Sequence, residues 1–169
     1  MKNFINSDDI SDYKKIVEEA IQLKSNPNQL EDIGKNKSIG LLFFNPSLRT
    51  RISTQKASMI LGLKTFVMNF NSEGWQLEFE NNTIMSEDKA EHVKDAAKVL
   101  SEYCDIIAIR KFADLNNKID DEKEIVLSSF LKYSTVPILN LESSTFHPLQ
   151  GLADAITIHE TKNKARPKI

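Results

Sequence analysis

The stretch SIGLLFFNPSLRTR, residues 38–51, decides the fold that the sequence predicts. Its apolar start, SIGLLFF, is too short for a buried helix and is bounded by polar residues, which is typical of a strand buried on both faces. The strand leads straight into a polar loop, and a helix is predicted from Thr50 to Leu61, where Gly62 suits the helix end. A buried strand followed at once by a loop and a helix is the repeating unit of parallel α/β domains.

The same alternation continues along the rest of the chain. Apolar runs at 64–70, 105–110 and 136–141 predict three more strands. Further helices are predicted over residues 8–24, with Ser7 as N-cap, over 89–103 and 122–133, and from Pro148 onward. The sequence therefore predicts an α/β domain in which a parallel four-stranded sheet carries helices on both faces.

The composition is that of one compact domain without metals or disulfides. The chain has 169 residues, of which 40% are hydrophobic and 27% charged, enough to bury a core. A formal net charge of −2 argues against nucleic acid as a partner. Cys104 is the only cysteine, and the three histidines lack metal-ligand spacing. Since no stretch suits a membrane span or a signal peptide, we expect no membrane partner and a cytoplasmic protein.

Residues suited to binding an anion follow the first predicted strand. Arg49 and Arg51 offer planar forks for phosphate oxygens, the hydroxyls of Ser47 and Thr50 can donate hydrogen bonds, and the helix begins at the same point. The segment predicts a phosphate site. A loop in which Ser47 caps the helix and both arginines are solvated explains the same residues.

Two other predicted strands end at residues of similar chemistry. Arg110 follows the third, and His147 and Gln150 surround the helix start after the fourth. Because ligands bind at the carboxyl ends of parallel strands, these residues should meet the SLRTR loop at one edge. An imidazole there can hydrogen-bond a carbonyl oxygen. A surface arginine and a structural histidine are the alternatives.

Together, SLRTR, Arg110 and HPLQ (147–150) resemble the three fixed elements of aspartate and ornithine carbamoyltransferases, in the same order and over nearly the whole chain. The resemblance implies that residues 1–162 form a carbamoyl-phosphate-binding domain. Residues 163–169 would then begin a linker to a missing ornithine-binding domain. It also implies a homotrimer and no metal or organic cofactor.

Several details are similar to the branch that acts on N-acetyl- or N-succinylornithine. Leu48 replaces the first Thr of the usual Ser-Thr-Arg-Thr-Arg, and Trp75 matches a tryptophan that reaches the adjacent subunit's carbamoyl phosphate. Glu142 resembles an acidic residue near the acylornithine. Ala90 aligns with a proline of the succinyl type and a glutamate of the acetyl type, so it lacks the charge that would repel a succinyl carboxylate. A packing role for Trp75 and an exposed carboxylate at Glu142 are the alternatives.

In the implied reaction, an N-acylornithine amine attacks carbamoyl phosphate, giving N-acylcitrulline and phosphate in arginine biosynthesis. The resemblance assigns phosphate binding to one set of residues and polarisation of the carbonyl to another: Ser47, the Leu48 backbone N–H, Arg49, Thr50 and Trp75 in the first, and Arg110 and His147 assisted by Thr50, with Gln150 nearby, in the second. The isolated chain is expected to bind weakly without turnover. The alternatives are an ordinary ornithine or aspartate carbamoyltransferase, a non-catalytic carbamoyl-phosphate-binding module and a ligand-free structural domain.

Overall fold

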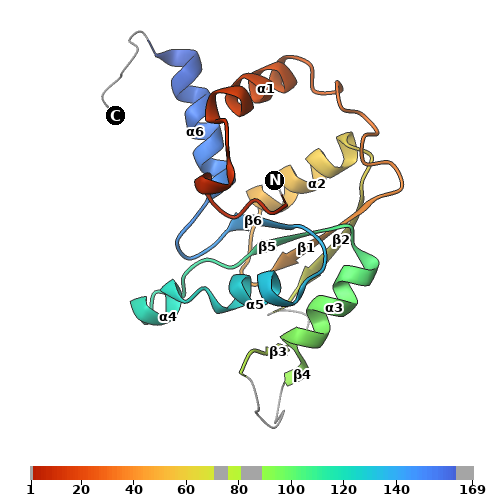
Figure 1. The fold of residues 1–169 in the computed structure, drawn as a ribbon, viewed down its shortest axis with the longest axis vertical. Coiled ribbons are helices and arrows are strands. Elements are labelled where there is room, and N and C mark those ends of the chain that lie inside the picture. Colours follow the sequence, from red (N-terminus) through yellow and green to blue (C-terminus); the bar gives the residue numbers. More distant parts are fainter. Residues whose placement is uncertain (1, 71–75, 81–88, 163–169) are drawn as a thin grey trace.

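Four parallel strands form the central sheet in the order β2-β1-β5-β6 (Figure 1). The computed structural model describes residues 2–70, 76–80 and 89–162, and in it the strands are β1 (Ser38–Phe43), β2 (Lys64–Asn69), β5 (Ile106–Arg110) and β6 (Ile138–Glu142). The chain moves from β1 outward to β2 and then returns to the other side of β1 for β5 and β6. The winding direction thus reverses between β1 and β5, and ligands of open α/β sheets bind at the carboxyl edge of such a reversal.

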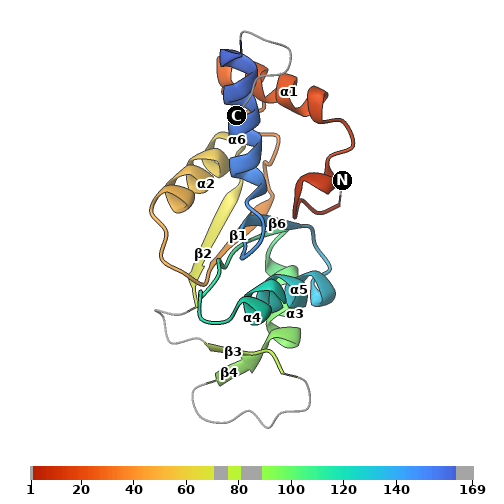
Figure 2. The same ribbon diagram turned by 90° about the vertical axis from the view of Figure 1, so that its left-hand side faces the viewer.

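Helices cover both faces of the sheet, which confirms the predicted fold class. Figures 1 and 2 show helices on each side of the sheet. The first face carries α3 (Val93–Tyr103) and α5 (Ile125–Tyr133). The second carries α2 (Arg49–Ile60) and α6 (Pro148–Thr161), with α1 (Tyr13–Ser25) packed against α6. The last helix starts at Pro148, as predicted.

The core follows from the alternation of side chains along the buried strands. Leu42, Ile107 and Ile109 pack with Phe130 toward α3 and α5, whereas Leu41 and Ala108 face α2 and α6. Phe130 is fully buried, and burial of such a side chain contributes about 1.5–3 kcal/mol. With apolar contacts on both faces, the sheet is a rigid base for the loops at its edge.

The N-terminal segment extends the sheet beyond β6. The N–H of Phe4 donates to the carbonyl of Ile138 at 2.9 Å, and the N–H of Asn140 donates to the carbonyl of Phe4 at 2.8 Å. Phe4 thereby forms an isolated parallel bridge with Leu139. The segment covers part of an edge that would otherwise present unpaired backbone groups.

The start of the first predicted helix is wrong by several residues. Helix α1 begins at Tyr13, where the Asp12 carboxylate accepts a hydrogen bond from the N–H of Lys15. The preceding residues Ser7–Asp9 form a separate 3₁₀ turn, η1, whose N-cap is Asn6 rather than Ser7. Two capping side chains in succession, Asn6 and Asp12, split the segment because each satisfies its own set of free N–H groups.

The helix predicted over 89–103 is half right. Lys89–His92 form strand β4, which pairs in parallel with β3 (Gln76–Glu78), and α3 begins only at Val93. The buried Glu78 carboxylate accepts a hydrogen bond from Lys89 Nζ at 2.6 Å. This contact, which no local pattern reveals, holds Lys89 beside β3. The small sheet lies next to α3 and apart from the main sheet (Figure 2).

The helix predicted over 122–133 is interrupted at Glu124. A short helix α4 (Lys118–Glu122) precedes α5, and the residue at the junction has a left-handed backbone, φ 44° and ψ 47°. This conformation costs about 1–2 kcal/mol for a residue other than glycine. Since DDEKEIV contains no glycine, proline or asparagine to signal a break, the conformation must be imposed by contacts elsewhere.

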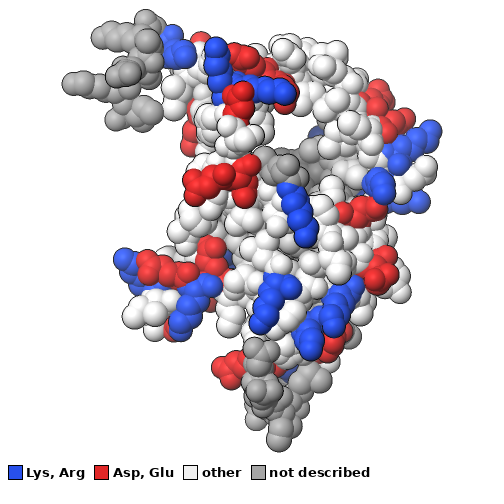
Figure 3. All heavy atoms as spheres, in the orientation of Figure 1, with Lys and Arg blue, Asp and Glu red and all other residues white. Residues whose placement is uncertain are grey.

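The surface has mixed charge, in keeping with the net charge of −2. Figure 3 shows acidic and basic side chains interspersed over the face that it presents. Within the described ranges, no helix is both long and apolar enough to cross a bilayer.

Stability at low pH should depend on Glu78. The hydrogen bond from Lys89, then that from the N–H of Glu80, lowers the pKa of the Glu78 carboxyl from 4.5 to about 2. A carboxyl whose pKa is lower in the folded state stabilises the fold above its ordinary pKa and loses that contribution as pH falls. We expect the free energy of unfolding to fall between pH 4.5 and 2, with a shallower fall in Glu78→Gln.

Urea unfolding at a series of pH values would measure this dependence. Glu18→Gln is the matched control, because Glu18 is exposed and forms a long, solvent-accessible pair with Lys14 at 3.8 Å. If Glu78→Gln and Glu18→Gln gave the same pH profile, the Glu78 ion pair would not be the source of acid sensitivity.

Candidate functional site

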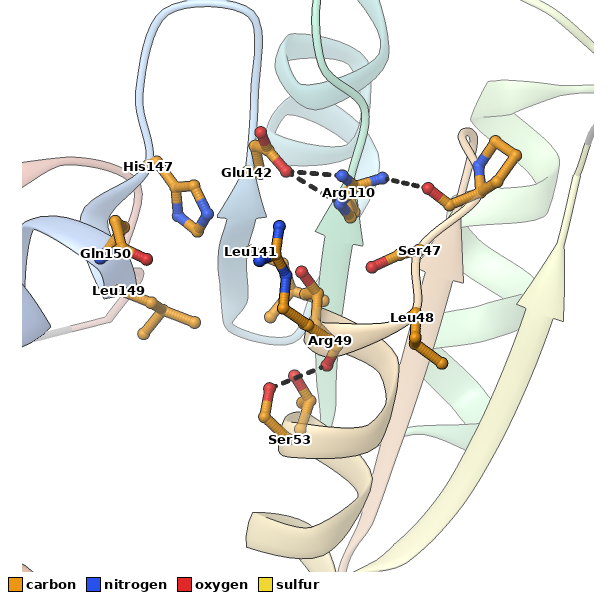
Figure 4. Close-up of a pocket in the computed structure, with 13 residues that line it drawn as sticks. Ser47, Leu48, Arg49, Ser53, Arg110, Leu141, Glu142, His147, Leu149 and Gln150 are labelled. Atoms are coloured by element: carbon orange, nitrogen blue, oxygen red, sulfur yellow. Dashed lines mark hydrogen bonds and ion pairs between the residues drawn. The ribbon is translucent and has the colours of Figure 1, made fainter.

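Three loops meet at the carboxyl edge of the sheet and enclose a cleft of about 960 Å³. Figure 4 shows side chains from the end of β1, β5 and β6 converging there. Its lining combines the loop after β1 and the first turns of α2 with the ends of β5 and β6 and the start of α6: Pro46, Ser47, Leu48, Arg49, Thr50, Ser53, Thr54, Arg110, Leu141, Glu142, His147, Leu149 and Gln150. The convergence of the three segments expected from the sequence is therefore confirmed.

Helix α2 enters the cleft with its N-terminus exposed. The helix begins at Arg49, one residue before the predicted start, and its N-cap position, Leu48, makes no side-chain hydrogen bond. Ser47 thus does not cap the helix, which was the simpler interpretation of this loop. The first N–H groups of a helix have no partner within the helix, so an end without a side-chain cap is suited to an anion.

The two arginines of the loop do not face the same point. Arg49 lines the cleft, and no hydrogen bond or ion pair joins its guanidinium to another described residue. Arg51 lies on the other side of the loop, where it donates to Asn69 Oδ1 on β2 and stands 4.9 Å from the Phe43 ring centroid. Residues two apart on a helix point in different directions. The expectation that both forks serve one phosphate is wrong for Arg51.

Arg110 connects all three loops. Its Nε donates to Glu142 Oε2 at 2.9 Å, and a terminal nitrogen lies 2.8 Å from the same oxygen. The other terminal nitrogen donates to the carbonyls of Pro46 at 2.9 Å and Asn45 at 3.4 Å. With its side chain only 11% exposed, Arg110 holds the β1 loop against the end of β6.

The pairing of Arg110 with Glu142 has a structural origin in the sheet. The register between β5 and β6 shifts by one residue between Ile109 and Arg110, so that Ile109 opposes Asn140 while Arg110 opposes Glu142. Bulges of this kind redirect a side chain at the end of a ladder. Glu142 is consequently not a free surface carboxylate, and it offsets the charge of Arg110. Among the described residues of the cleft, Arg49 is the cation without a paired carboxylate.

His147 stands at the N-terminal end of α6 with its ring toward the cleft (Figure 4). Its side chain does not cap the helix, and its Nδ1 is buried without a hydrogen-bond partner within the described protein. Gln150 also lines the cleft, with its Nε2 donating to Asp154 at 2.9 Å.

The turn before His147 is held by residues that the sequence did not single out. Asn140, 0% exposed, donates through Nδ2 to Ser143 Oγ at 3.1 Å, the Phe146 carbonyl at 3.4 Å and the Ile5 carbonyl at 2.9 Å. The N–H of Ser143 also donates to the Phe146 carbonyl at 2.8 Å. An asparagine within the apolar run VPILNL was the available signal, since buried polar side chains need partners.

One predicted site residue, Ala90, is not at this cleft. Ala90 is exposed on β4, in the small sheet beside α3, and does not line the cleft. Trp75 lies outside the described residues, as do residues 163–169, which were predicted to begin a linker. Ser53 and Thr54, in the next turn of α2, also line the cleft, although no motif in the sequence indicates them.

In chemical terms, the cleft suits a small anion that also carries a polar neutral group. The uncompensated Arg49, the hydroxyls of Ser47 and Thr50 and the N-terminus of α2 gather at one side. Arg110 and His147 approach from the ends of other strands, with hydrogen-bond donors suited to a carbonyl oxygen.

Comparison with known proteins identifies the class to which this fold and cleft belong. The family described as "Aspartate/ornithine carbamoyltransferase, carbamoyl-P binding domain" matches residues 2–160. The chain belongs to this family of carbamoyltransferase domains.

Its relatives include acylornithine carbamoyltransferases. N-succinylornithine carbamoyltransferase of Bacteroides fragilis is 43% identical over 100% of this chain and 53% of its own length. N-acetylornithine carbamoyltransferase of Xylella fastidiosa is 38% identical over 95% of this chain and 47% of its own length. The chain thus spans about half the length of these relatives.

Solved structures of similar proteins share the fold closely. Acetylornithine transcarbamylase complexed with acetylcitrulline superimposes with a TM-score of 0.89 at 37% identity, over 99% of this chain and 51% of that one. A mutant of N-acetyl-L-ornithine transcarbamylase, with a glutamate replaced by alanine, is complexed with carbamyl phosphate and N-succinyl-L-norvaline, and it gives the same TM-score, identity and coverage.

Proposed function

We propose that this chain forms the carbamoyl-phosphate-binding half of an N-acylornithine carbamoyltransferase. The whole protein would transfer the carbamoyl group from carbamoyl phosphate to the side-chain amine of N-succinyl-L-ornithine, giving N-succinylcitrulline and phosphate in arginine biosynthesis. The observation that carries the proposal is the cleft in which Arg49, Arg110 and His147 meet from three separate loops. Residues 1–162 are the proposed binding domain, residues 163–169 the proposed start of a linker, and the cytoplasm the proposed location.

The phosphate of carbamoyl phosphate is proposed to bind at the start of α2. Arg49 supplies a guanidinium that has no competing carboxylate among the described residues, and a planar fork matches two phosphate oxygens. Ser47, Thr50 and the Leu48 N–H add neutral donors, and the uncapped helix end favours negative charge. Trp75 of an adjacent subunit is proposed to complete the site in a homotrimer.

The carbonyl of carbamoyl phosphate is proposed to face Arg110 and His147, with Thr50 assisting and Gln150 nearby. The amine attacks the carbonyl carbon, the bond from that carbon to the phosphate oxygen breaks, and the proton lost by the amine ends on phosphate. Negative charge builds on the carbonyl oxygen during attack, and donors already in place stabilise it without reorganisation. Arg110 meets this condition because Glu142 and the Pro46 carbonyl fix its guanidinium. Loss of one such donor typically costs a factor of about 100–1000 in rate.

Several observations support succinylornithine as the acceptor. Identity is 43% to an N-succinylornithine enzyme against 38% to an N-acetylornithine enzyme. By the family resemblance, Ala90 occupies the position of a glutamate in the acetyl type. Mutants of N-acetyl-L-ornithine transcarbamylase with one glutamate replaced by valine, alanine or serine are complexed with N-succinyl-L-norvaline. Because Ala90 does not line the cleft of its own chain, it would act at the site of an adjacent subunit. Glu142 is proposed to contact the acylornithine through the carboxylate oxygen that Arg110 does not use.

Phosphate binding should depend on Arg49 and not on Arg51. We expect Arg49→Ala to weaken binding of inorganic phosphate and of phosphonoacetamide, a carbamoyl phosphate analogue with a methylene bridge, by at least about tenfold, since a charge-assisted bidentate contact is lost. Arg51→Ala should change either affinity by less than about threefold, because Arg51 contacts Asn69 and Phe43 instead.

Calorimetric titration of the wild-type chain and both variants measures these affinities. The two arginines are two residues apart on the same helix, so Arg51→Ala is a matched control for lost charge. Equal weakening by both substitutions, or none by Arg49→Ala, would refute the proposed phosphate position.

The acceptor can be tested with the whole protein. Product formation from carbamoyl phosphate should be fastest with N-succinylornithine, compared with N-acetylornithine, ornithine and aspartate. Ala90→Glu should lower kcat/KM for N-succinylornithine by at least about tenfold through like-charge repulsion, and for N-acetylornithine by much less.

The isolated 169-residue chain should form no citrulline product with any of these amines. Turnover by the isolated chain, or a whole protein that prefers ornithine or aspartate, would contradict the proposed reaction. A whole protein that binds carbamoyl phosphate and transfers it to none of the four amines would indicate a non-catalytic binding module.

A further inference from the structure

The turn that carries His147 is fixed from outside by Glu124. The carboxylate Oε1 of Glu124 accepts a hydrogen bond of 2.7 Å from the N–H of Thr145, two residues before His147. Glu124 lies at the junction of α4 and α5, twenty-one positions earlier in the chain, and does not line the cleft. Its hydrogen bond to the turn is the contact through which it can affect a bound ligand.

The backbone of Glu124 points to a specific need for this side chain. Its N–H donates to the Asp121 carbonyl at 3.1 Å and its own carbonyl accepts from the Ser128 N–H at 2.9 Å, so the residue ends α4 and begins α5. The left-handed backbone at such a position favours glycine. A residue that keeps a strained conformation does so because its surroundings require it, and glycine would satisfy the backbone without providing the carboxylate.

The turn is thus held from two sides. Asn140 and Ser143 donate to the Phe146 carbonyl, while Glu124 accepts from the N–H of the preceding residue, Thr145. The position of the His147 ring depends on both supports, since its own side chain makes no capping bond to α6. Misplacement of a reacting group by about 1 Å can cost up to about 100-fold.

We infer that Glu124 is a positioning residue that sets the His147 imidazole toward the carbonyl half of the ligand. The inference rests on the proposed function, because it takes His147 as the group that meets the carbonyl. The proposed phosphate position at the start of α2 is formed by residues of the β1 loop and α2, to which Glu124 makes no hydrogen bond.

Two ligands separate the two halves of the site. Inorganic phosphate occupies only the part at α2, whereas phosphonoacetamide also presents a carbonyl to His147. We expect Glu124→Gly to weaken the binding of phosphonoacetamide about tenfold and the binding of phosphate less than about twofold. Its melting temperature should stay within about 3 °C of the wild type, because relief of the left-handed backbone offsets the lost hydrogen bond.

Two further variants sharpen the test. Glu124→Gln keeps a neutral acceptor for the Thr145 N–H, so it should restore most of the affinity and weaken phosphonoacetamide only about threefold. Glu122→Gln is the control: this neighbouring carboxylate pairs with exposed Lys118 at 3.5 Å and should have no effect on either ligand.

A double-mutant cycle then tests the route through the imidazole. His147→Ala alone should weaken the binding of phosphonoacetamide. In that background Glu124→Gly should change the affinity by less than about twofold, because the contact between the imidazole and the ligand carbonyl is already lost. Equal weakening of both ligands by Glu124→Gly, or an undiminished effect in the His147→Ala background, would overturn the inference while leaving the phosphate site intact. If neither ligand binds the wild-type chain, the proposed function and the inference fail together.

Discussion

The guanidinium of Arg110 is the contact on which the arrangement of the cleft depends. It joins the end of β5 to the Glu142 carboxylate on β6 and to the carbonyls of Asn45 and Pro46 in the loop after β1. The β1 loop leads directly to Arg49 and the N-terminus of α2, so the phosphate-suited end of the cleft is held relative to β6 by one side chain. A charged group at 11% exposure needs such partners, and the same partners give the loops a single arrangement.

The rigidity of this arrangement comes from the sheet beneath it. Strands β1 and β5 are buried on both faces, and the change in winding direction between them opens the crevice that the loops line. The one-residue shift of register before Arg110 brings it opposite Glu142. Asn140, next to the core residue Leu141 on β6, donates a hydrogen bond to the Phe146 carbonyl and so ties the turn before His147 to the sheet. The ends of the strands thus hold the loops that line the site.

The sequence predicted those parts of the fold that local pattern determines. Short apolar runs followed by turn residues, such as SIGLLFF, predict buried strands. The alternation of these strands with helices predicts a parallel sheet. The same logic brought Arg49, Arg110 and His147 to one edge, because parallel strands end together. It could not reveal β4, which depends on an ion pair between Lys89 and Glu78, or the break at Glu124, whose partner Thr145 is distant in the chain. Arg51 was misjudged for a different reason: the predicted helix already included it, but a side chain two positions after Arg49 on a helix points away from Arg49, here toward Asn69 and Phe43.

The proposed site is tested most directly by a crystal structure of the chain with bound phosphonoacetamide. We expect phosphonate oxygens within about 3 Å of the Arg49 guanidinium and of the first N–H groups of α2, and the carbonyl oxygen within the same distance of Arg110 and His147. A ligand seated elsewhere, for example in the more apolar pocket of Met68, Phe70 and Val99 between β2 and α3, would contradict it. So would a ligand in the cleft whose carbonyl points away from both Arg110 and His147.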